Sequence, residues 1–136
     1  MRGCSLNKVR ILLADDHPDF PEMEERLLQP EFEIVGKVND GEALFEEAMR
    51  LKPDVVITDI SMPILNGIGA VERLKESHCN SQIIFLTVHS DLDFVKTCLS
   101  TGAVGYVLKS RMAADLTPAV RAALNGCTFV SETLLK

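Results

Sequence analysis

Short apolar runs recur along the chain, and each run is continuous rather than alternating with polar residues. Val and Ile dominate these runs, which is typical of strands that are buried on both faces of a parallel sheet. The pattern therefore predicts five strands, each with helices above and below it. The predicted strands are Val9–Ala14, Ile34–Val38, Val55–Thr58, Ile83–Leu86 and Tyr106–Leu108.

The segments between these runs carry apolar residues at helical spacing, so one helix is predicted after each strand. The predicted inner faces contain Phe20, Met23 and Leu27; Leu44, Ala48 and Leu51; Ile68, Val71 and Leu74; Val95, Cys98 and Leu99; and Leu116, Val120 and Ala123. Pro30 and Pro53 follow the first two helices, and Gly102 and Gly126 fall at the expected ends of the last two. The segment from Ser90 to Asp93 predicts a capping box that opens the fourth helix.

This alternation predicts an α/β fold of (βα)5 type. Right-handed crossovers then give a doubly wound, parallel, five-stranded sheet with the flavodoxin-like strand order 2-1-3-4-5. In such a fold the ligand crevice lies beyond the carboxyl ends of the strands, at the switch in strand order. Residues 129–136 are expected to form a tail without a strand or a complete helix.

The composition fits one domain with its own core, because 46% of the 136 residues are hydrophobic. The net charge is −6, and the chain lacks the basic run that binding to duplex DNA requires. The four cysteines show neither CxxC spacing nor a His/Cys cluster, which argues against zinc and disulfides and suits a reducing cytoplasm. Every apolar run is far shorter than the roughly 20 residues of a membrane span, so we expect a soluble protein.

Polar residues stand at the carboxyl ends of the predicted strands. They are Asp15, Asp16, Asp59, Thr87 and Lys109. Each alone has an ordinary explanation as a helix cap, a turn residue, a strand residue or a solvated charge. Together they converge on one crevice, because the first and third strands are neighbours in the predicted order. Three close carboxylates repel one another unless a cation neutralises them, and an all-oxygen ligand set predicts Mg²⁺. With the positive charge of Lys109, the arrangement predicts a phosphoryl-transfer site.

The motifs around these residues resemble those of the response regulator receiver domains of two-component signalling. The resemblance covers residues 6–126 and rests on ILLADDHP around the acidic pair, DVVITDISMPILNG around Asp59, FLTVHS around Thr87 and GAVGYVLKS around Lys109. The forms DDHP, GAVGYVLK and AVRAALNGCTFVS are similar to the NarL/FixJ subgroup, in which a LuxR-type helix-turn-helix domain follows the receiver. Residues 127–136 are then the start of a linker towards an output domain.

The resemblance implies a phosphoacceptor and a metal site. Asp59 is the nucleophile that takes a phosphoryl group from a phosphohistidine of a sensor histidine kinase. Asp16 and Asp59 bind Mg²⁺ directly, Asp15 binds it through water, and the backbone carbonyl of Ser61 completes the protein ligands.

The resemblance also implies a switch. Lys109 pairs with the phosphoryl oxygens, and the Thr87 hydroxyl moves to hydrogen-bond one of them. Tyr106 follows Thr87 inward and changes the face formed by the fourth helix, fifth strand and fifth helix, through which a homodimer can form. The alternative for Tyr106 is a core residue with its hydroxyl in water.

By this resemblance the chain is a signalling domain rather than an enzyme that acts on a separate substrate. It catalyses its own phosphorylation and the slow hydrolysis of its aspartyl phosphate. DNA is reached only through an output domain that lies outside this chain, and no membrane is involved. Two alternatives remain: a single-domain regulator or phosphorelay carrier, and an interaction module that no longer accepts phosphate.

Other proteins with related folds fit the residues less well. A flavodoxin-like cofactor site needs a phosphate cradle where this chain has Asp15-Asp16-His17-Pro18, and a Rossmann enzyme needs GxGxxG after the first strand. Haloacid-dehalogenase-type phosphatases need an Asp where Ser61 stands. His89 either tunes dephosphorylation or is a solvated loop residue. Ser110 follows Lys109 where many receivers have proline, and the isomer of that peptide bond stays open.

Overall fold

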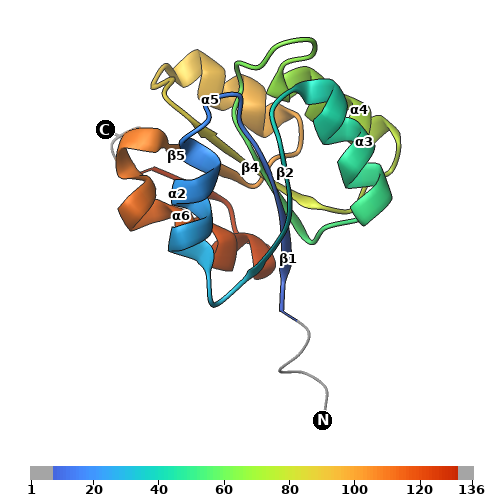
Figure 1. Cartoon of the computed structure of the whole chain (residues 1–136). Coiled ribbons are helices and arrows are strands. Elements are labelled where there is room, and N and C mark those ends of the chain that lie inside the picture. Colours follow the sequence, from blue (N-terminus) through green and yellow to red (C-terminus); the bar gives the residue numbers. More distant parts are fainter. Residues whose placement is uncertain (1–7, 132–136) are drawn as a thin grey trace.

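The computed structural model describes residues 8–131, in which one parallel sheet lies between two layers of helices (Figure 1). The strands are β1 (Arg10–Ala14), β2 (Glu33–Val38), β3 (Val55–Thr58), β4 (Gln82–Thr87), β5 (Gly105–Leu108) and β6 (Phe129–Val130). The helices are α2 (Phe20–Leu28), α3 (Gly41–Leu51), α4 (Gly67–Glu76), α5 (Leu92–Ser100) and α6 (Met112–Leu124), with a 3-10 turn η1 (Lys109–Arg111). The expected domain start at Leu6 and residues 132–136 of the expected tail lie outside the described residues.

The strand order is β2-β1-β3-β4-β5-β6, with every neighbouring pair parallel. The first five strands confirm the predicted order 2-1-3-4-5. The prediction of a tail without a strand was wrong, because Phe129 and Val130 add a sixth strand beside β5. A strand of two residues is too short to produce a hydrophobic period, so the sequence pattern gave no sign of it.

Ser131 fixes the end of this sixth strand. Its backbone N–H donates to the carbonyl of Tyr106 at 2.9 Å, and its hydroxyl donates to Asp115 Oδ2 at 2.8 Å. The same hydroxyl accepts a hydrogen bond from the backbone N–H of Leu108 at 3.0 Å. Ser131 is fully buried, so these bonds join β5, β6 and α6 away from water.

The helices divide between the two faces of the sheet. Side chains of α3, α4 and α5 share one core with the strands, and side chains of α2 and α6 share the other. Strands β1, β3, β4 and β5 are buried almost throughout, whereas the edge strand β2 is partly exposed and does not fit the expectation of burial on both faces. Within residues 8–131, none of the helices combines the length and the apolar character needed to cross a bilayer.

The helix boundaries agree with most of the sequence signals. Gly102 and Gly126 have positive φ angles of 97° and 73° just beyond α5 and α6, as expected for glycines that end helices. The predicted capping box at Ser90 was wrong. Asp91 is the N-cap residue of α5, and its side chain makes no capping hydrogen bond.

The strand register aligns the carboxyl ends of β1, β3, β4 and β5 at one edge of the sheet. Ala14 pairs with Thr58, Thr58 pairs with Phe85, and Thr87 pairs with Leu108. Because the strands are parallel and aligned in this way, the residues that follow β1, β3 and β5 emerge at the same edge of the sheet.

We predict that Ser131→Ala destabilises the fold although it lies far along the chain from the strand-end aspartates. The substitution leaves the buried Leu108 N–H without its acceptor and removes a donor to Asp115, so we expect a loss of about 1–3 kcal/mol in the free energy of unfolding. Urea denaturation measures this loss. Ser90→Ala is the control, because Ser90 is exposed and caps no helix; an equal effect of the two substitutions would contradict the anchoring role of Ser131.

Candidate functional site

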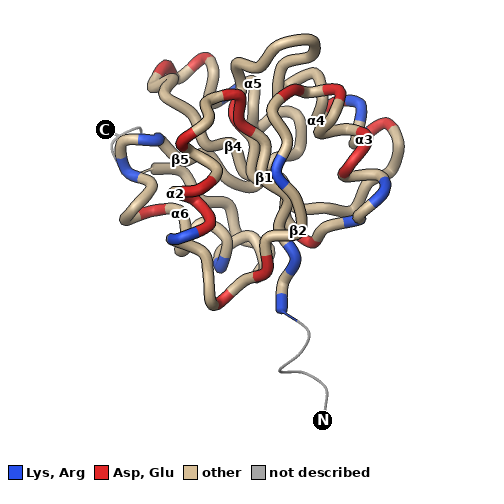
Figure 2. The backbone as a smooth tube through the Cα atoms, viewed as in Figure 1, with Lys and Arg blue, Asp and Glu red and all other residues tan. Residues whose placement is uncertain are grey.

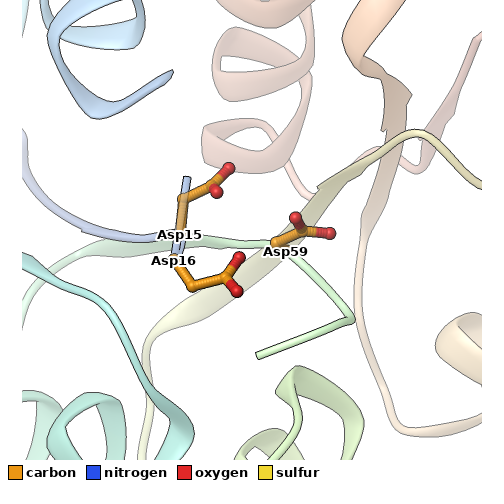
Figure 3. Close-up of side chains that lie close together, drawn as sticks. All are labelled: Asp15, Asp16 and Asp59. Carbon is orange, nitrogen blue, oxygen red and sulfur yellow. The ribbon is translucent and has the colours of Figure 1, made fainter. Parts of the chain in front are cut away.

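Three carboxylates meet at the carboxyl edge of the sheet. Asp15 and Asp16 follow β1, Asp59 follows β3, and one oxygen of each lies within 4.8 Å of the others (Figure 3). Asp15 and Asp59 are buried, and Asp16 is exposed. The cluster is therefore rooted in the core and open to solvent on one side.

Backbone hydrogen bonds fix the two buried aspartates. The N–H of Asp15 donates to Val38 O at 3.0 Å, and the N–H of Asp59 donates to Ala14 O at 2.9 Å. The carboxylate of Asp59 accepts a 2.6 Å hydrogen bond from the N–H of Ile60. Gly67 also packs here, since a Cβ on it would lie 1.9 Å from the carbonyl oxygen of Asp59. The backbone around Asp59 thus depends on a residue without a side chain.

Lys109 joins the two buried carboxylates. Its Nζ lies 2.7 Å from Asp15 Oδ2 and 2.8 Å from Asp59 Oδ2, with only 6% of its side chain exposed. The contact with Asp59 is a hydrogen bond, whereas Asp15 Oδ2 has no hydrogen bond of good geometry and interacts through charge. The ammonium also lies 4.1 Å from the centre of the Phe20 ring, which closes it off from solvent by a cation–π contact.

Burial is the largest single influence on the pKa values of both Asp15 and Lys109. Burial raises the pKa of Asp15, and the charge of Asp59 adds to that effect, although Lys109 and the N–H of His17 oppose it. Burial lowers the pKa of Lys109, but its close contacts with the carboxylates of Asp15 and Asp59 outweigh burial and raise that pKa above its ordinary value. Lys109 is therefore held as a cation, and the buried negative charge exceeds it.

These residues fit a hard divalent cation. The donors are all oxygens, Asp16 is exposed to solvent, and within residues 8–131 the buried Asp15 Oδ2 is paired only with the ammonium of Lys109. Such a set suits Mg²⁺, which retains several waters beside one or two carboxylates. Ser61, whose carbonyl was predicted to complete the ligands, lies two residues after Asp59 on an exposed part of the chain.

A groove leads from the surface to the cluster. Its volume is about 490 Å³, and it runs between the start of α2 and the end of β2. The residues that line it are Asp15, Asp16, Pro18, Pro21, Glu22, Lys37, Val38, Asn39 and Ala43. The lining holds three acidic residues and one cation, Lys37, so its net charge is negative. Figure 2 shows acidic residues along α2.

Thr87 and Tyr106 are both buried beside the cluster. Thr87 is the last residue of β4, and its hydroxyl accepts a hydrogen bond from the N–H of His89 at 3.3 Å. Tyr106 lies inside the core, and its hydroxyl donates to the carbonyl oxygen of His89 at 2.7 Å. The hydroxyl of Tyr106 is therefore bonded to protein, unlike in the alternative that leaves it in water.

His89 connects several parts of this edge. Its Nε2 lies 3.1 Å from the hydroxyl of Ser61, and its ring stacks on Phe94 of α5 with centroids 4.4 Å apart. It is therefore not simply a solvated loop residue. The peptide bond between Lys109 and Ser110 is trans, because the cis peptide bond in residues 8–131 is the one between Gln29 and Pro30.

The sequence analysis missed Glu24. It placed Met23 on the inner face of the first helix, but Met23 is 42% exposed, whereas Glu24 is 1% exposed. Neither carboxyl oxygen of Glu24 has a hydrogen-bond partner among the described residues 8–131. Its burial, reinforced by the charges of Asp15 and Asp59, raises its pKa to about 9. The signal was the spacing from Phe20, since a step of four residues places position 24 on the same face of the helix.

The comparisons with known proteins agree on one family. A model of the response regulator receiver domain matches residues 11–121. The transcriptional regulatory protein DegU of Brevibacillus brevis is 37% identical over 91% of this chain and 53% of its own length. The nitrate/nitrite response regulator protein NarL of Escherichia coli strain K12 is 35% identical over 91% of this chain and 58% of its own length. This chain thus spans little more than half of these curated relatives.

A solved structure gives the same result. The crystal structure of a two-component response regulator of the LuxR family from Aurantimonas sp. SI85-9A1 superposes with a TM-score of 0.89 at 30% sequence identity. The alignment covers 95% of this chain and 94% of that one. The predicted resemblance to receivers of this subgroup is confirmed.

We predict that Glu24 makes the fold less stable as the pH rises. The folded chain keeps the Glu24 proton up to a pKa of about 9, whereas the unfolded chain loses it near the ordinary value of 4.5. The stabilisation by this proton is therefore complete below pH 4.5 and is lost between there and pH 9, at up to about 1.4 kcal/mol per pH unit.

Urea denaturation of the wild type and Glu24→Gln at pH 6, 7.5 and 9 checks this dependence, because the amide has no proton to lose in that range. We expect the free energy of unfolding to fall more steeply with pH in the wild type. Parallel curves for the two proteins would show that Glu24 titrates normally in the folded chain.

Proposed function

The chain belongs to the response regulator receiver domain family, and from that premise we propose that it is a phosphorylation-dependent signalling switch with Asp59 as its phosphoacceptor. The observation that carries this proposal is the pairing of Lys109 with Asp59 at 2.8 Å inside a cluster of three carboxylates. A buried carboxylate between a fixed cation and further acidic oxygens is the arrangement that phosphoryl transfer requires.

The chemistry is a displacement at phosphorus. One carboxylate oxygen of Asp59 attacks the phosphoryl group of a phosphohistidine, the bond from phosphorus to the imidazole nitrogen breaks, and the donor histidine keeps that electron pair. We propose a sensor histidine kinase as the donor. Mg²⁺ bound by Asp15, Asp16, Asp59 and the carbonyl of Ser61 would neutralise the negative charge of the carboxylates and of the transferred group.

The protein side chains then hold the transferred group. Lys109 already lies beside Asp59, so its ammonium needs little movement to pair with the phosphoryl oxygens. Thr87 Oγ1 accepts the hydrogen bond from the N–H of His89, which leaves its own proton to donate to a phosphoryl oxygen. Capture thus relies on positioned charges and donors rather than on a separate acid or base.

The readout runs through His89. A movement of Thr87 towards the phosphoryl group changes its bond with the N–H of His89, and the carbonyl of the same residue accepts from Tyr106. The His89 ring stacks on Phe94, so the change reaches α5. We propose that the face formed by α5, β5 and α6 reports the phosphorylation state to a partner or a second copy. Tyr106 is buried and acts from behind this face.

Output through transcription is part of the proposal. The relatives DegU and NarL are named as a transcriptional regulator and a response regulator, and each is longer than this chain. We propose that residues from Cys127 onwards lead to a DNA-binding domain, although β6 shows that Phe129 and Val130 belong to the receiver fold. A cytoplasmic location is supported by Cys79, Cys98 and Cys127, which form no disulfides.

We predict that acetyl phosphate and Mg²⁺ add one phosphoryl group to this chain and that Asp59→Asn prevents the addition, because the amide cannot act as the nucleophile. Intact-protein mass spectrometry measures the adduct. Asp19→Asn is the matched control, since Asp19 is exposed outside the cluster, and it should be modified like the wild type. A wild type that gains no mass would instead favour the interaction module that accepts no phosphate.

We also predict that Mg²⁺ raises the melting temperature through the acidic cluster. At about ten times its Kd the ion should stabilise the fold by about 1.4 kcal/mol, which corresponds to roughly 4 °C in Tm. Calorimetry with and without Mg²⁺ measures the shift. Asp16→Asn should reduce it because one ligand is lost, whereas Asp19→Asn should keep it; an unchanged shift in Asp16→Asn would place the ion elsewhere.

A further inference from the structure

Glu24 belongs to the inner face of α2, where the neighbouring positions are apolar. Phe20 and Leu28 lie one helical turn before and after it, and Leu28 is buried in the core shared with α6. The ring of Phe20 packs against the ammonium of Lys109 at 4.1 Å. Glu24 therefore lies on the side of the helix that faces the acidic cluster, within the electrostatic reach of Asp15, Asp59 and Lys109.

Within residues 8–131, the charged groups around α2 provide no counterion for an ionised Glu24. Lys109 is already shared between two carboxylates. On the elements packed against α2, the cations form ion pairs with other acids, namely Arg111 with Asp115 and Arg121 with Glu31 on the α6 side, and Lys37 of β2 with Glu25. A buried carboxylate without a partner is costly, so burial keeps the proton on Glu24, and the negative charges of Asp15 and Asp59 add to that effect.

A divalent cation changes this balance because its two positive charges cancel the excess negative charge of the cluster, in which three carboxylates face one ammonium. We propose that cation binding at Asp15, Asp16 and Asp59 expels the proton of Glu24, so that the receiver exchanges a proton for a divalent cation. The O–H bond of the carboxyl breaks, its electron pair stays on the carboxylate, and the proton passes to solvent. This inference rests on the proposed function, because it requires a cation in the acidic cluster.

The exchange makes cation affinity depend on pH through a residue that is not a ligand. Protons compete with the cation at the cluster, so affinity rises with pH over the range in which Glu24 keeps its proton in the cation-free chain. Since one carboxyl carries one proton, the logarithm of the affinity gains at most about one unit per pH unit from this residue. Glu24 thus changes the affinity of the cluster for the cation through its charge, without contacting the cation itself.

The test counts protons released when Mg²⁺ is added to the full chain in weakly buffered solution at pH 8. At that pH most of the wild-type Glu24 is protonated, because its pKa is about 9. Calorimetry gives the bound Mg²⁺, and an indicator dye gives the protons. We expect the wild type to release more protons per bound ion than Glu24→Gln does, by up to about one. Protons from the aspartates are common to both proteins and cancel in the difference.

Glu46→Gln is the matched control, because it makes the same change at an exposed position of α3 and should release protons like the wild type. Glu24→Leu provides a second variant without an ionisable group, for which the same reduced release is expected should Glu24→Gln fold poorly. Equal release by the wild type and the Glu24 variants, with Mg²⁺ bound to all of them, would overturn the exchange. A wild type that binds no Mg²⁺ would instead overturn the proposed function.

Discussion

The ion pairs of Lys109 with Asp15 and Asp59 are the interaction on which the functional edge depends. Each of the three groups is almost completely buried, and each would be strongly destabilising there without the others. The pairing also leaves an unbalanced negative charge, since two carboxylates share one ammonium. A divalent cation bound at this edge would neutralise that imbalance.

The fold supplies this geometry through its backbone. Parallel register aligns the ends of β1 and β3, and the hydrogen bonds from Asp15 to Val38 and from Asp59 to Ala14 extend the ladder just past the strands. Carboxylates that follow neighbouring strands are thereby forced together whether or not they repel. The sheet, stabilised by two apolar cores, contributes the free energy that holds like charges at short range.

Much of this arrangement could be predicted from the sequence because it depends on periodicity and on position in the chain. Continuous apolar runs predicted the inner strands. The positions of Asp15, Asp59 and Lys109 directly after these strands predicted that the three side chains lie close together. The sixth strand was missed because two residues carry no period. Glu24 was missed because the inner face of the first helix was traced through apolar residues only, which placed Met23 there. The bond between Ser61 and His89 depends on loop conformations that no local pattern encodes.

The sixth strand connects the end of the described chain to β5, which leads into Lys109 of the acidic cluster. Ser131 is bonded to the carbonyl of Tyr106 and to the N–H of Leu108, so the point where the backbone leaves the described fold is attached to β5, the strand that precedes Lys109. A displacement of β5 would therefore act directly on Ser131 through these hydrogen bonds.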